Sequence, residues 1–388
     1  MNKRLLLAFG LVLCGAAAHA ERQPDGGGEA PLGQSQPCLT EEQRQEIKAQ
    51  IYRSAAELRG RGLLLSDVTQ VGLAWPLKGA TPLGDPGVHG ISNFVDQNMF
   101  YPNQLLDYSC GVPARTYDTA GGYNHSGTDM FTWPFSWLKM DRNEVQVVAA
   151  APGTIVYKSD GNFDRSCATA GGAWNAVYVE HGDGSMAWYG HLKNGSTTTK
   201  LVGESVAAGE YLGIVGSSGR SSGPHLHFEL HDASGALIDP YQGACNTLNA
   251  ISWWTAQRPY RDSAINKLAT HAEPPEFPAC PNQETPNLSN YFAPGSALIV
   301  AAYYRDQQAG HVTSFSVQRP DGSTWRSWMS TADITYNASY WWYIDTLPAS
   351  PVGRWNLRAV YQGVTYDHGF NVLVAGDLIF QDGFQIGL

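Results

Sequence analysis

The stretch SSGPHLHFEL, residues 221–230, carries the pattern on which the predicted fold and site depend. Its composition is that of a β-strand, in which side chains two positions apart point to the same face of the sheet. His225 and His227 are therefore expected to face one cleft. Two histidines on one strand face are a common way to present metal ligands, although taken alone they fit an ordinary protein surface equally well.

A second candidate pair lies upstream in HSGTD, residues 125–129. Neutral imidazole and carboxylate groups both bind zinc, and the glycine between His125 and Asp129 permits a turn that brings both to one ion. The spacing is common by chance, and Asp129 alone would suit a turn cap. His191 ends a predicted strand, whereas His181 precedes an Asp-Gly turn and is expected to shape a hairpin through a hydrogen bond.

Short apolar runs separated by turns surround these histidines, and no long helix is predicted between residues 72 and 239. Such runs, bounded by Gly, Pro and Asp, are typical of strands. The pattern predicts a mainly β fold in which an antiparallel sheet folds on itself. The strands are expected in the runs 145–158, 177–180, 186–191, 212–215 and 225–230.

Length and composition limit the class of protein. With 388 residues the chain has room for roughly one to three domains. Charged residues make up 15%, against roughly 25% in average soluble proteins, and 42 glycines and 11% aromatics favour an extracellular β protein. The net charge of -10 argues against nucleic acid as a partner, because phosphate binding needs a basic surface.

The first twenty residues have the features of a signal peptide. Lys3 and Arg4 precede an apolar run over 5–13, and Ala-His-Ala at 18–20 suits signal peptidase. The apolar run is too short to span a membrane, and no other stretch predicts a transmembrane segment. We therefore expect export, with a secreted or periplasmic location.

Residues 21–70 are predicted to be a linker followed by one amphipathic helix. Thr40 with Gln43 forms a capping box, and Gly60 ends the apolar pattern. One helix face carries Ile47, Ile51, Ala55 and Leu58. A single helix cannot form a domain, so this segment is expected either to act as a pro-segment that blocks the enzyme until removed or to serve as a spacer.

The C-terminal third of the chain predicts a separate domain. Residues 263–271 are expected to form a short helix, and 263–284 is a proline-rich linker. Alternating strands over 285–375 predict an immunoglobulin-like β-sandwich, with a short tail at 376–388. Its aromatics are expected either to fill the core or to stack on sugars of a cell wall: Trp325, Trp328, Tyr340, Trp341, Trp342, Tyr343 and Trp355.

Five of the six cysteines lie beyond the signal peptide. Export permits disulfides, and pairing of neighbours would join Cys110 to Cys167 and Cys245 to Cys280, although sequence does not fix the connectivity. Cys38 is then left over. None of the five shows the C-x-x-C spacing of a zinc site.

Together the histidine-bearing stretches resemble the lysostaphin-type metallopeptidases, a family that includes beta-lytic endopeptidases and staphylolysin. The similarity runs from residue 124 to 241, within a predicted domain at 71–262, and rests on H-x-x-x-D, Y-x-H-L and S-x-G-P-H-L-H-F-E in the family's order. It implies that His125, Asp129 and His227 bind one zinc ion per chain. It also implies that His191 and His225 are the non-ligand catalytic histidines.

The resemblance implies a zinc endopeptidase that cuts peptides of peptidoglycan with zinc-activated water. His225 would act as general base and His191 would assist the oxyanion or the leaving amine, although sequence leaves the two roles interchangeable. One alternative is the same chemistry on glycine-rich extracellular proteins. Another is a non-catalytic activator of a cell-wall amidase, which would be expected to lack one of the five residues. We expect a monomer, and contact with the cell wall or its glycans is one of the two roles left open for the C-terminal domain.

Overall fold

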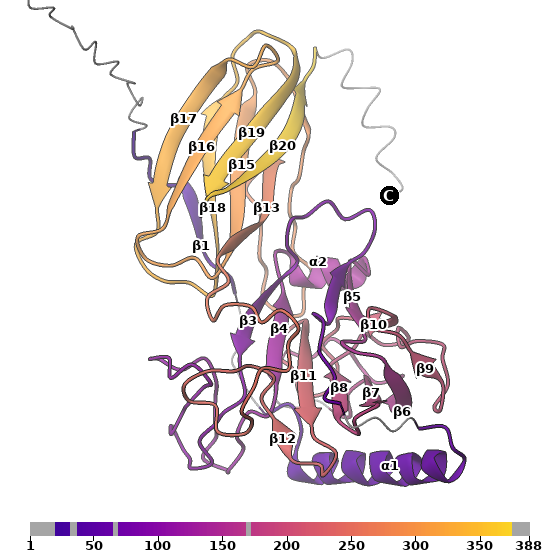
Figure 1. Cartoon of the computed structure of the whole chain (residues 1–388). Coiled ribbons are helices and arrows are strands. Elements are labelled where there is room, and N and C mark those ends of the chain that lie inside the picture. The colour runs from indigo at the N-terminus through magenta and orange to yellow at the C-terminus, as the bar shows by residue number, and fades with distance from the viewer. Residues whose placement is uncertain (1–19, 32–36, 65–68, 168–171, 375–388) are drawn as a thin grey trace, which may run out of the picture.

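The structure is a computed structural model that describes residues 20–31, 37–64, 69–167 and 172–374. Nearly all of the predicted signal peptide, and the predicted tail at 376–388, lie outside the described residues. The chain forms two β-rich parts, one above the other in Figure 1, with a long helix along the lower part. Among the residues described, no helix is both long enough and apolar enough to cross a membrane.

The lower part is built on a large antiparallel sheet, as the alternating apolar runs predict. Its strand order is β3-β4-β11-β8-β7-β6-β9, with β12 added beside β11. The strands are β3 (His89–Asn93), β4 (Thr128–Thr132), β11 (His225–His231), β8 (Met186–Gly190), β7 (Ala176–His181), β6 (Gly153–Ser159), β9 (Ser205–Val206) and β12 (Leu237–Ile238). The short helix α2 (Ser136–Asp141) follows β4.

A three-stranded sheet packs on this large sheet and closes the core of the lower part. It has the order β10-β5-β2, with β10 (Tyr211–Ile214), β5 (Val145–Val148) and β2 (Leu77–Gly79). Val147 and Leu212 from the small sheet meet Leu226, Phe228 and Leu230 of β11 in one buried cluster. The apolar face of β11 is therefore fixed against the core, which leaves its other face for the histidines.

The upper part consists of two sheets that share one core, the arrangement expected of a sandwich. One sheet has the order β1-β18-β15-β13, and the other β14-β20-β19-β16-β17. The strands are β1 (Gly26–Glu29), β18 (Ala338–Thr346), β15 (Ala297–Arg305), β13 (Ala264–His271), β14 (Tyr291–Phe292), β20 (Val364–Val372), β19 (Gly353–Tyr361), β16 (Val312–Gln318) and β17 (Thr324–Thr331). Phe315, Trp328, Tyr343, Trp355 and Phe370 fill the space between them.

The seven aromatics of this part are mainly structural. Trp328, Tyr343 and Trp355 are buried, and the other four are partly buried rather than exposed. Tyr340 and Trp342 pack in a cluster between the two parts, beside Trp133 and Phe135. Of the two predicted roles, the structural one accounts for the observed burial, because these side chains fill the core and the contact region between the two parts.

Two segments differ from the sequence-based expectation. Residues 264–271, expected as a short helix in a linker, form strand β13 paired with β15, and a register shift between Ile265 and Lys267 obscures the alternation that marks a strand. Residues 26–29, expected as linker, form β1 on the edge of the same sheet. A Cβ on Gly26 would lie 2.1 Å from the Trp342 ring, so the glycines there permit pairing rather than flexibility.

The disulfide pairing expected from sequence is wrong. The structure joins Cys110 to Cys245 and Cys167 to Cys280, while Cys38 is free and buried. Folding places the Cys245 amide against the carbonyl of Tyr108 at 2.9 Å, so the partner of Cys110 is distant in sequence but adjacent in space.

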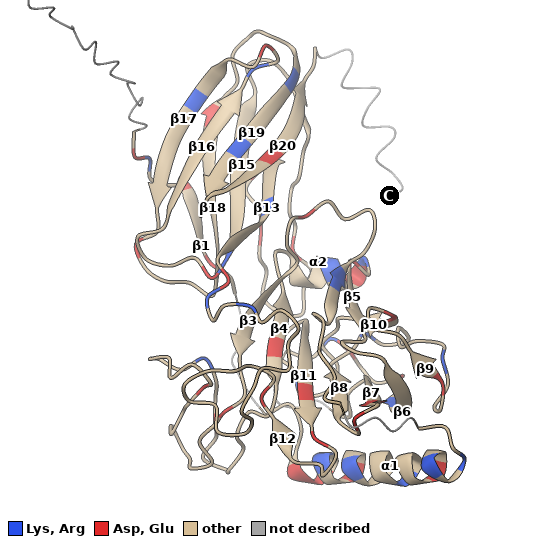
Figure 2. Ribbon diagram, in the orientation of Figure 1, with Lys and Arg blue, Asp and Glu red and all other residues tan. Residues whose placement is uncertain are grey.

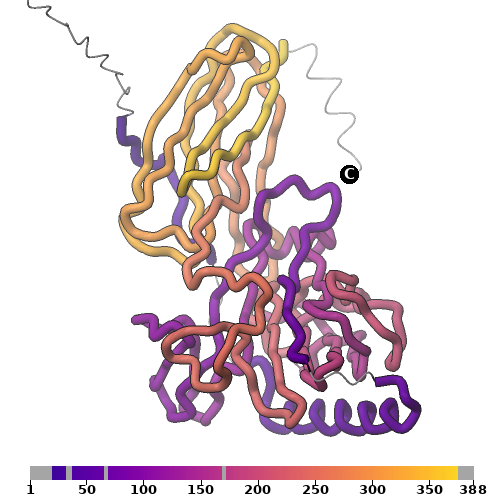
Figure 3. Tube along the Cα trace, in the orientation of Figure 1, coloured from indigo at the N-terminus to yellow at the C-terminus, as the bar shows by residue number. Residues whose placement is uncertain are grey.

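Helix α1 (Glu41–Gly60) has the predicted capping box between Thr40 and Gln43. Ile51, Ala55 and Leu58 are buried in a cluster with residues of β6, β7 and β8. Figure 2 shows acidic residues at the start of the helix and basic residues at several places along it. The trace in Figure 3 shows that the N-terminal segment accompanies the upper part first and then passes beneath the lower part, so it contacts both.

Candidate metal centre

Three neighbouring strands bring the predicted site residues together. On β11, His227 pairs with Asp129 of β4 on one side and with Gly190 of β8 on the other. His191 directly follows Gly190, and His125 lies just before β4. Pairing register, which sequence periodicity does not encode, therefore sets the five residues in one place.

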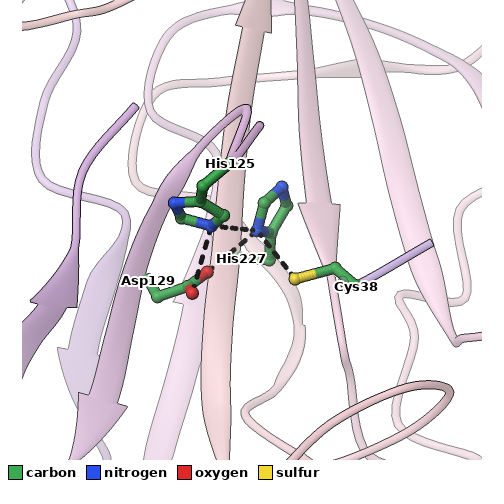
Figure 4. Close-up of side chains that lie close together, drawn as sticks. All are labelled: Cys38, His125, Asp129 and His227. Carbon is green, nitrogen blue, oxygen red and sulfur yellow. Dashed lines mark hydrogen bonds and ion pairs between the residues drawn. The ribbon is translucent and has the colours of Figure 1, made fainter. Parts of the chain in front are cut away.

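The expected ligand atoms converge in a buried cluster (Figure 4). His125 Nε2 lies 3.4 Å from His227 Nδ1, and the Asp129 carboxylate lies 2.8 Å from His227 Nδ1 and 3.1 Å from His125 Nε2. Cys38 Sγ, which the sequence did not place here, lies 3.5 Å from the same His227 Nδ1. One ligand atom from each of the four residues lies within 4.8 Å of every other.

These distances suit a tetrahedral zinc ion. With zinc–nitrogen bonds of about 2.05 Å and zinc–sulfur bonds of about 2.3 Å, the edges of a tetrahedron are about 3.3 Å for N···N and about 3.6 Å for N···S. The observed His125–His227 and Cys38–His227 separations of 3.4 and 3.5 Å are close to both values. The Asp129 contacts are somewhat shorter, at hydrogen-bond length. The donor set of two imidazoles, one carboxylate and one thiol is typical of zinc.

The rings of the two expected ligand histidines are each held by a hydrogen-bond partner on the side away from the cluster. His125 Nδ1 lies 2.7 Å from the carbonyl of Phe94, and His227 Nε2 lies 3.1 Å from the Glu229 carboxylate. A ring nitrogen that donates to such a partner leaves the opposite nitrogen with a lone pair for a metal. Each histidine therefore directs its other ring nitrogen toward the cluster, Nε2 from His125 and Nδ1 from His227, and that nitrogen can bind a metal once it has lost its proton.

His191 and His225 are oriented in the same way, with their ring centroids 4.4 Å apart. His191 Nδ1 lies 2.6 Å from the Ser218 carbonyl, and His225 Nδ1 lies 2.8 Å from that of Gly223. Both Nε2 atoms are thereby left available for proton transfer. His191 has a left-handed φ of 62°, which is uncommon for a residue other than glycine and is often found at functional sites.

Electrostatics within the cluster favour a cation. Burial alone would raise the pKa of Asp129, but the nearby His125 and His225 outweigh it and hold that pKa well below its usual range. Burial alone would lower the pKa of His125. The Asp129 carboxylate more than offsets this effect and raises the pKa of His125 to about 9. Burial lowers the pKa of His191. Without a metal ion the Asp129 carboxylate is therefore balanced by protonated imidazole, whose charge a bound cation would replace, while His191 stays neutral.

A groove of about 460 Å³ leads away from the cluster. Of the five expected site residues, Asp129 and His225 reach it, and Cys38 lines it as well. Its walls come from the loop 220–224, from Phe131 and Trp133, from residues 277–280 and from residues 30–31. The N-terminal segment therefore forms part of the wall of the same groove.

Sequence reasoning missed some members of the site. Glu229 follows His225 and His227 at the strand period of two, so the same alternation could have identified it. Asn93, whose Nδ2 lies 3.1 Å from Asp129, gave no signal. The only sign of Cys38 in the sequence was that five cysteines, an odd number, lie beyond the predicted signal peptide. His181, expected to be structural, lies apart with Nδ1 2.8 Å from the Pro152 carbonyl.

Comparison with known proteins identifies the region around this cluster. Residues 125–240 match the family model described as Peptidase family M23. The DD-carboxypeptidase/endopeptidase Mpg of Neisseria meningitidis serogroup B is 38% identical over 101 residues, 26% of this chain and 20% of the relative. The peptidoglycan DD-endopeptidase ShyC of Vibrio cholerae is 40% identical over 148 residues, 36% of this chain and 29% of the relative.

Among solved structures, the catalytic domain of the antimicrobial peptidase lysostaphin from Staphylococcus simulans is similar to this chain. It is 27% identical, with a TM-score of 0.23, and the match covers 32% of this chain and 83% of that one. The chain spans about a fifth of the length of the first curated relative, so the likeness concerns one domain.

Proposed function

Because residues 125–240 form a domain of Peptidase family M23, we propose that the chain is an exported zinc endopeptidase that hydrolyses peptide bonds in peptidoglycan. The observation that carries the proposal is the convergence of five residues from separate parts of the chain into one cluster. A non-catalytic activator would need no such complete set. Two relatives, a DD-carboxypeptidase/endopeptidase and a peptidoglycan DD-endopeptidase, support the substrate class.

His125, Asp129 and His227 would hold the metal. When bound, zinc supplies a Lewis acid and lowers the pKa of a coordinated water. We assign the general base to His225, whose Nε2 lies 3.7 Å from Asp129 and thus beside the ligands. It takes a proton at Nε2, since its Nδ1 is committed to the Gly223 carbonyl.

His191, which directly follows β8 on the other side of β11 from β4, completes the set. Its Nε2 is buried without a hydrogen-bond partner, so it is available to the reacting peptide. Once protonated, it can donate to the developing oxyanion or to the leaving amine. Ser218 keeps this ring in place through its carbonyl, which makes Ser218 a positioning residue rather than a catalytic one.

The groove suits an extended peptide with small side chains. Ser221, Ser222 and Gly223 line one side of it, and aromatic side chains form the other. The net charge of -10 provides no long-range attraction to an anionic wall. Binding would therefore depend on shape and on hydrogen bonds within the groove.

The proposal is tested by zinc content and by release of amino groups from purified peptidoglycan, for the chain with and without residues 1–70 and with a chelator as control. We expect about one zinc per chain and chelator-sensitive hydrolysis in at least the shortened form. Elastin as a parallel substrate tests the alternative of glycine-rich proteins. Absence of zinc from both forms, or equal hydrolysis after chelation, would contradict the proposal.

A further inference from the structure

Residues 37–60 lie across the candidate metal centre. Cys38 and Leu39 are buried with side chains of the large sheet, and the carbonyl of Pro37 accepts a hydrogen bond from Arg220 Nε at 3.0 Å. Arg220 belongs to the loop that forms one wall of the groove. The segment is thus held on the groove immediately before α1 begins.

The Cys38 sulfur lies where a fourth ligand is expected. Its distance of 3.5 Å from His227 Nδ1 is close to the edge of about 3.6 Å for a tetrahedron with one sulfur and one nitrogen ligand. Catalytic zinc sites have three protein ligands and one open position, whereas sites with four protein ligands are closed. With Cys38 included, the present cluster is of the closed kind.

Burial of the catalytic groups is an independent sign that this space is occupied. The side chains of His125, His191 and His227 are fully inaccessible, although an endopeptidase must admit a peptide to them. His191 Nε2 is buried without a hydrogen-bond partner. Cys38 Sγ also lies within 4.8 Å of ring nitrogens of His191 and His225, so the sulfur stands between the expected ligands and the catalytic pair.

The segment has its own anchors, which hold the sulfur in place. Arg44 of α1 forms an ion pair with Glu229, which is fully buried. Glu229 in turn contacts His227 Nε2, so the helix reaches the carboxylate that orients a ligand. Arg59 pairs with Glu180, and the apolar face of α1 packs on the sheet.

We propose that Cys38 is the fourth protein ligand of the metal in a latent form of this protein, and that residues 37–60 are an inhibitory segment whose release opens the site. The inference rests on the proposed function, because it concerns the same metal ion. Withdrawal of the segment leaves His125, Asp129 and His227 in place, uncovers the buried His191 and widens the access to His225, which already reaches the groove. The segment therefore controls access to the site without forming part of the catalytic machinery.

Metal spectroscopy tests the ligand directly in the full-length chain. In a Cys14→Ser background Cys38 is the sole unpaired cysteine, since the other four form disulfides. Loaded with cobalt(II), this chain should show a thiolate-to-cobalt charge-transfer band in the near ultraviolet. Cys38→Ser and Cys38→Ala should both lose the band, while the matched control His191→Ala, which removes a neighbour of the sulfur, should keep it.

Metal affinity and the reactivity of the Cys38 thiol distinguish a metal ligand from a thiol that is merely buried. Loss of an outer partner of a zinc ligand weakens affinity about 10–100-fold, so loss of a ligand in Cys38→Ala should weaken it by about tenfold or more. Cys38 should react with a thiol reagent at least tenfold faster after chelation. A merely buried thiol would react equally slowly with and without zinc.

Hydrolysis of peptidoglycan by the full-length chain should rise in Cys38→Ala and Cys38→Ser. A chain that binds one metal ion but shows no charge-transfer band, no zinc-dependent protection of Cys38 and no gain of activity in either variant would overturn the inference and leave the proposed function standing. Failure of the native and shortened chains to bind metal would instead overturn the proposed function.

Discussion

Strands β11 and β19 occupy similar positions in the two parts of the molecule and are used differently. Each is paired on both sides, β11 with β4 and β8, and β19 with β16 and β20. β19 buries Trp355, Leu357, Ala359 and Tyr361 and leaves the alternate residues at least partly accessible. β11 buries both faces apart from the partly accessible His225: one face is apolar, and the other is made of His225, His227, Glu229 and His231.

The difference shows what a polar strand face in a protein interior requires. Burying a polar or charged group is costly unless it has partners. Glu229 has three, Arg44, His227 and His231. His227 keeps one nitrogen for Glu229 and turns the other toward the cluster. Such a face persists in a β-sheet because the surrounding groups, and a metal ion in the proposed function, compensate its burial.

Buried histidines of the two parts also differ in the groups that surround them. In the upper part, His271 Nδ1 lies 2.6 Å from the Pro286 carbonyl, and Nε2 lies 3.2 Å from the Tyr303 hydroxyl. Burial lowers its pKa to about 4, and neither hydrogen-bond partner is a carboxylate. In the lower part, Asp129 reverses the effect of burial on His125. A buried histidine beside a carboxylate and a second histidine is therefore the better metal candidate.

The largest expected effect is loss of the metal on changing β11. His227→Ala should abolish zinc binding and reduce hydrolysis by about a thousandfold or more, because a bound metal supplies several kcal/mol of transition-state stabilisation. Zinc content and the rate of amino-group release measure this. His181→Gln, a change at a buried histidine outside the cluster, is the matched control and should keep both. Retention of zinc by His227→Ala would place the metal elsewhere.

A smaller loss is expected when a histidine that does not bind the metal is changed. His225→Ala and His191→Ala should each reduce hydrolysis about 10²–10⁴-fold, the usual contribution of general acid or base catalysis, and should keep zinc. Metal analysis of the same preparations separates the two groups of histidines. If His225→Ala lost the metal, the division of roles between His225 and His227 would be wrong.

Changing the apolar strand should affect stability and leave the metal centre intact. Trp355 is 1% exposed between the two sheets of the upper part, and truncation of such a side chain typically costs about 3–5 kcal/mol. Trp355→Ala should therefore lower the free energy of unfolding of that part in a denaturant titration. Arg358→Ala, an outward neighbour on β19, serves as control. If the Trp355→Ala chain lost zinc while it was still fully folded, the metal centre would not be independent of the upper part.

The upper part should also lose stability in mild acid because of His271. The folded state holds this ring neutral down to a pKa of about 4, whereas the unfolded chain protonates it near 6.5. The unfolded state thus binds more protons between these values, so the free energy of unfolding should fall by about 3 kcal/mol as pH drops from 6.5 to 4. Denaturant titrations across this range should show a weaker dependence on pH in His271→Gln.

The sequence alone determined what depends on local periodicity and local caps. Alternation along 225–230 placed both histidines on one face, the capping box of Thr40 and Gln43 set the start of α1, and the ordered motifs indicated the family. These features were predictable because a strand has a period of two and a helix a period of 3.6, so neighbours in sequence report on them.

Tertiary structure alone decided what joins distant parts of the chain. Which segments pack together decides the register that sets Asp129 opposite His227, the two disulfides, the edge strand β1 and the position of Cys38 in the candidate metal cluster. Local sequence carries no record of such contacts, because their free energy comes from surfaces that become neighbours only when the chain has folded. For that reason Cys38 was an unexplained cysteine in the sequence and is a candidate metal ligand in the structure.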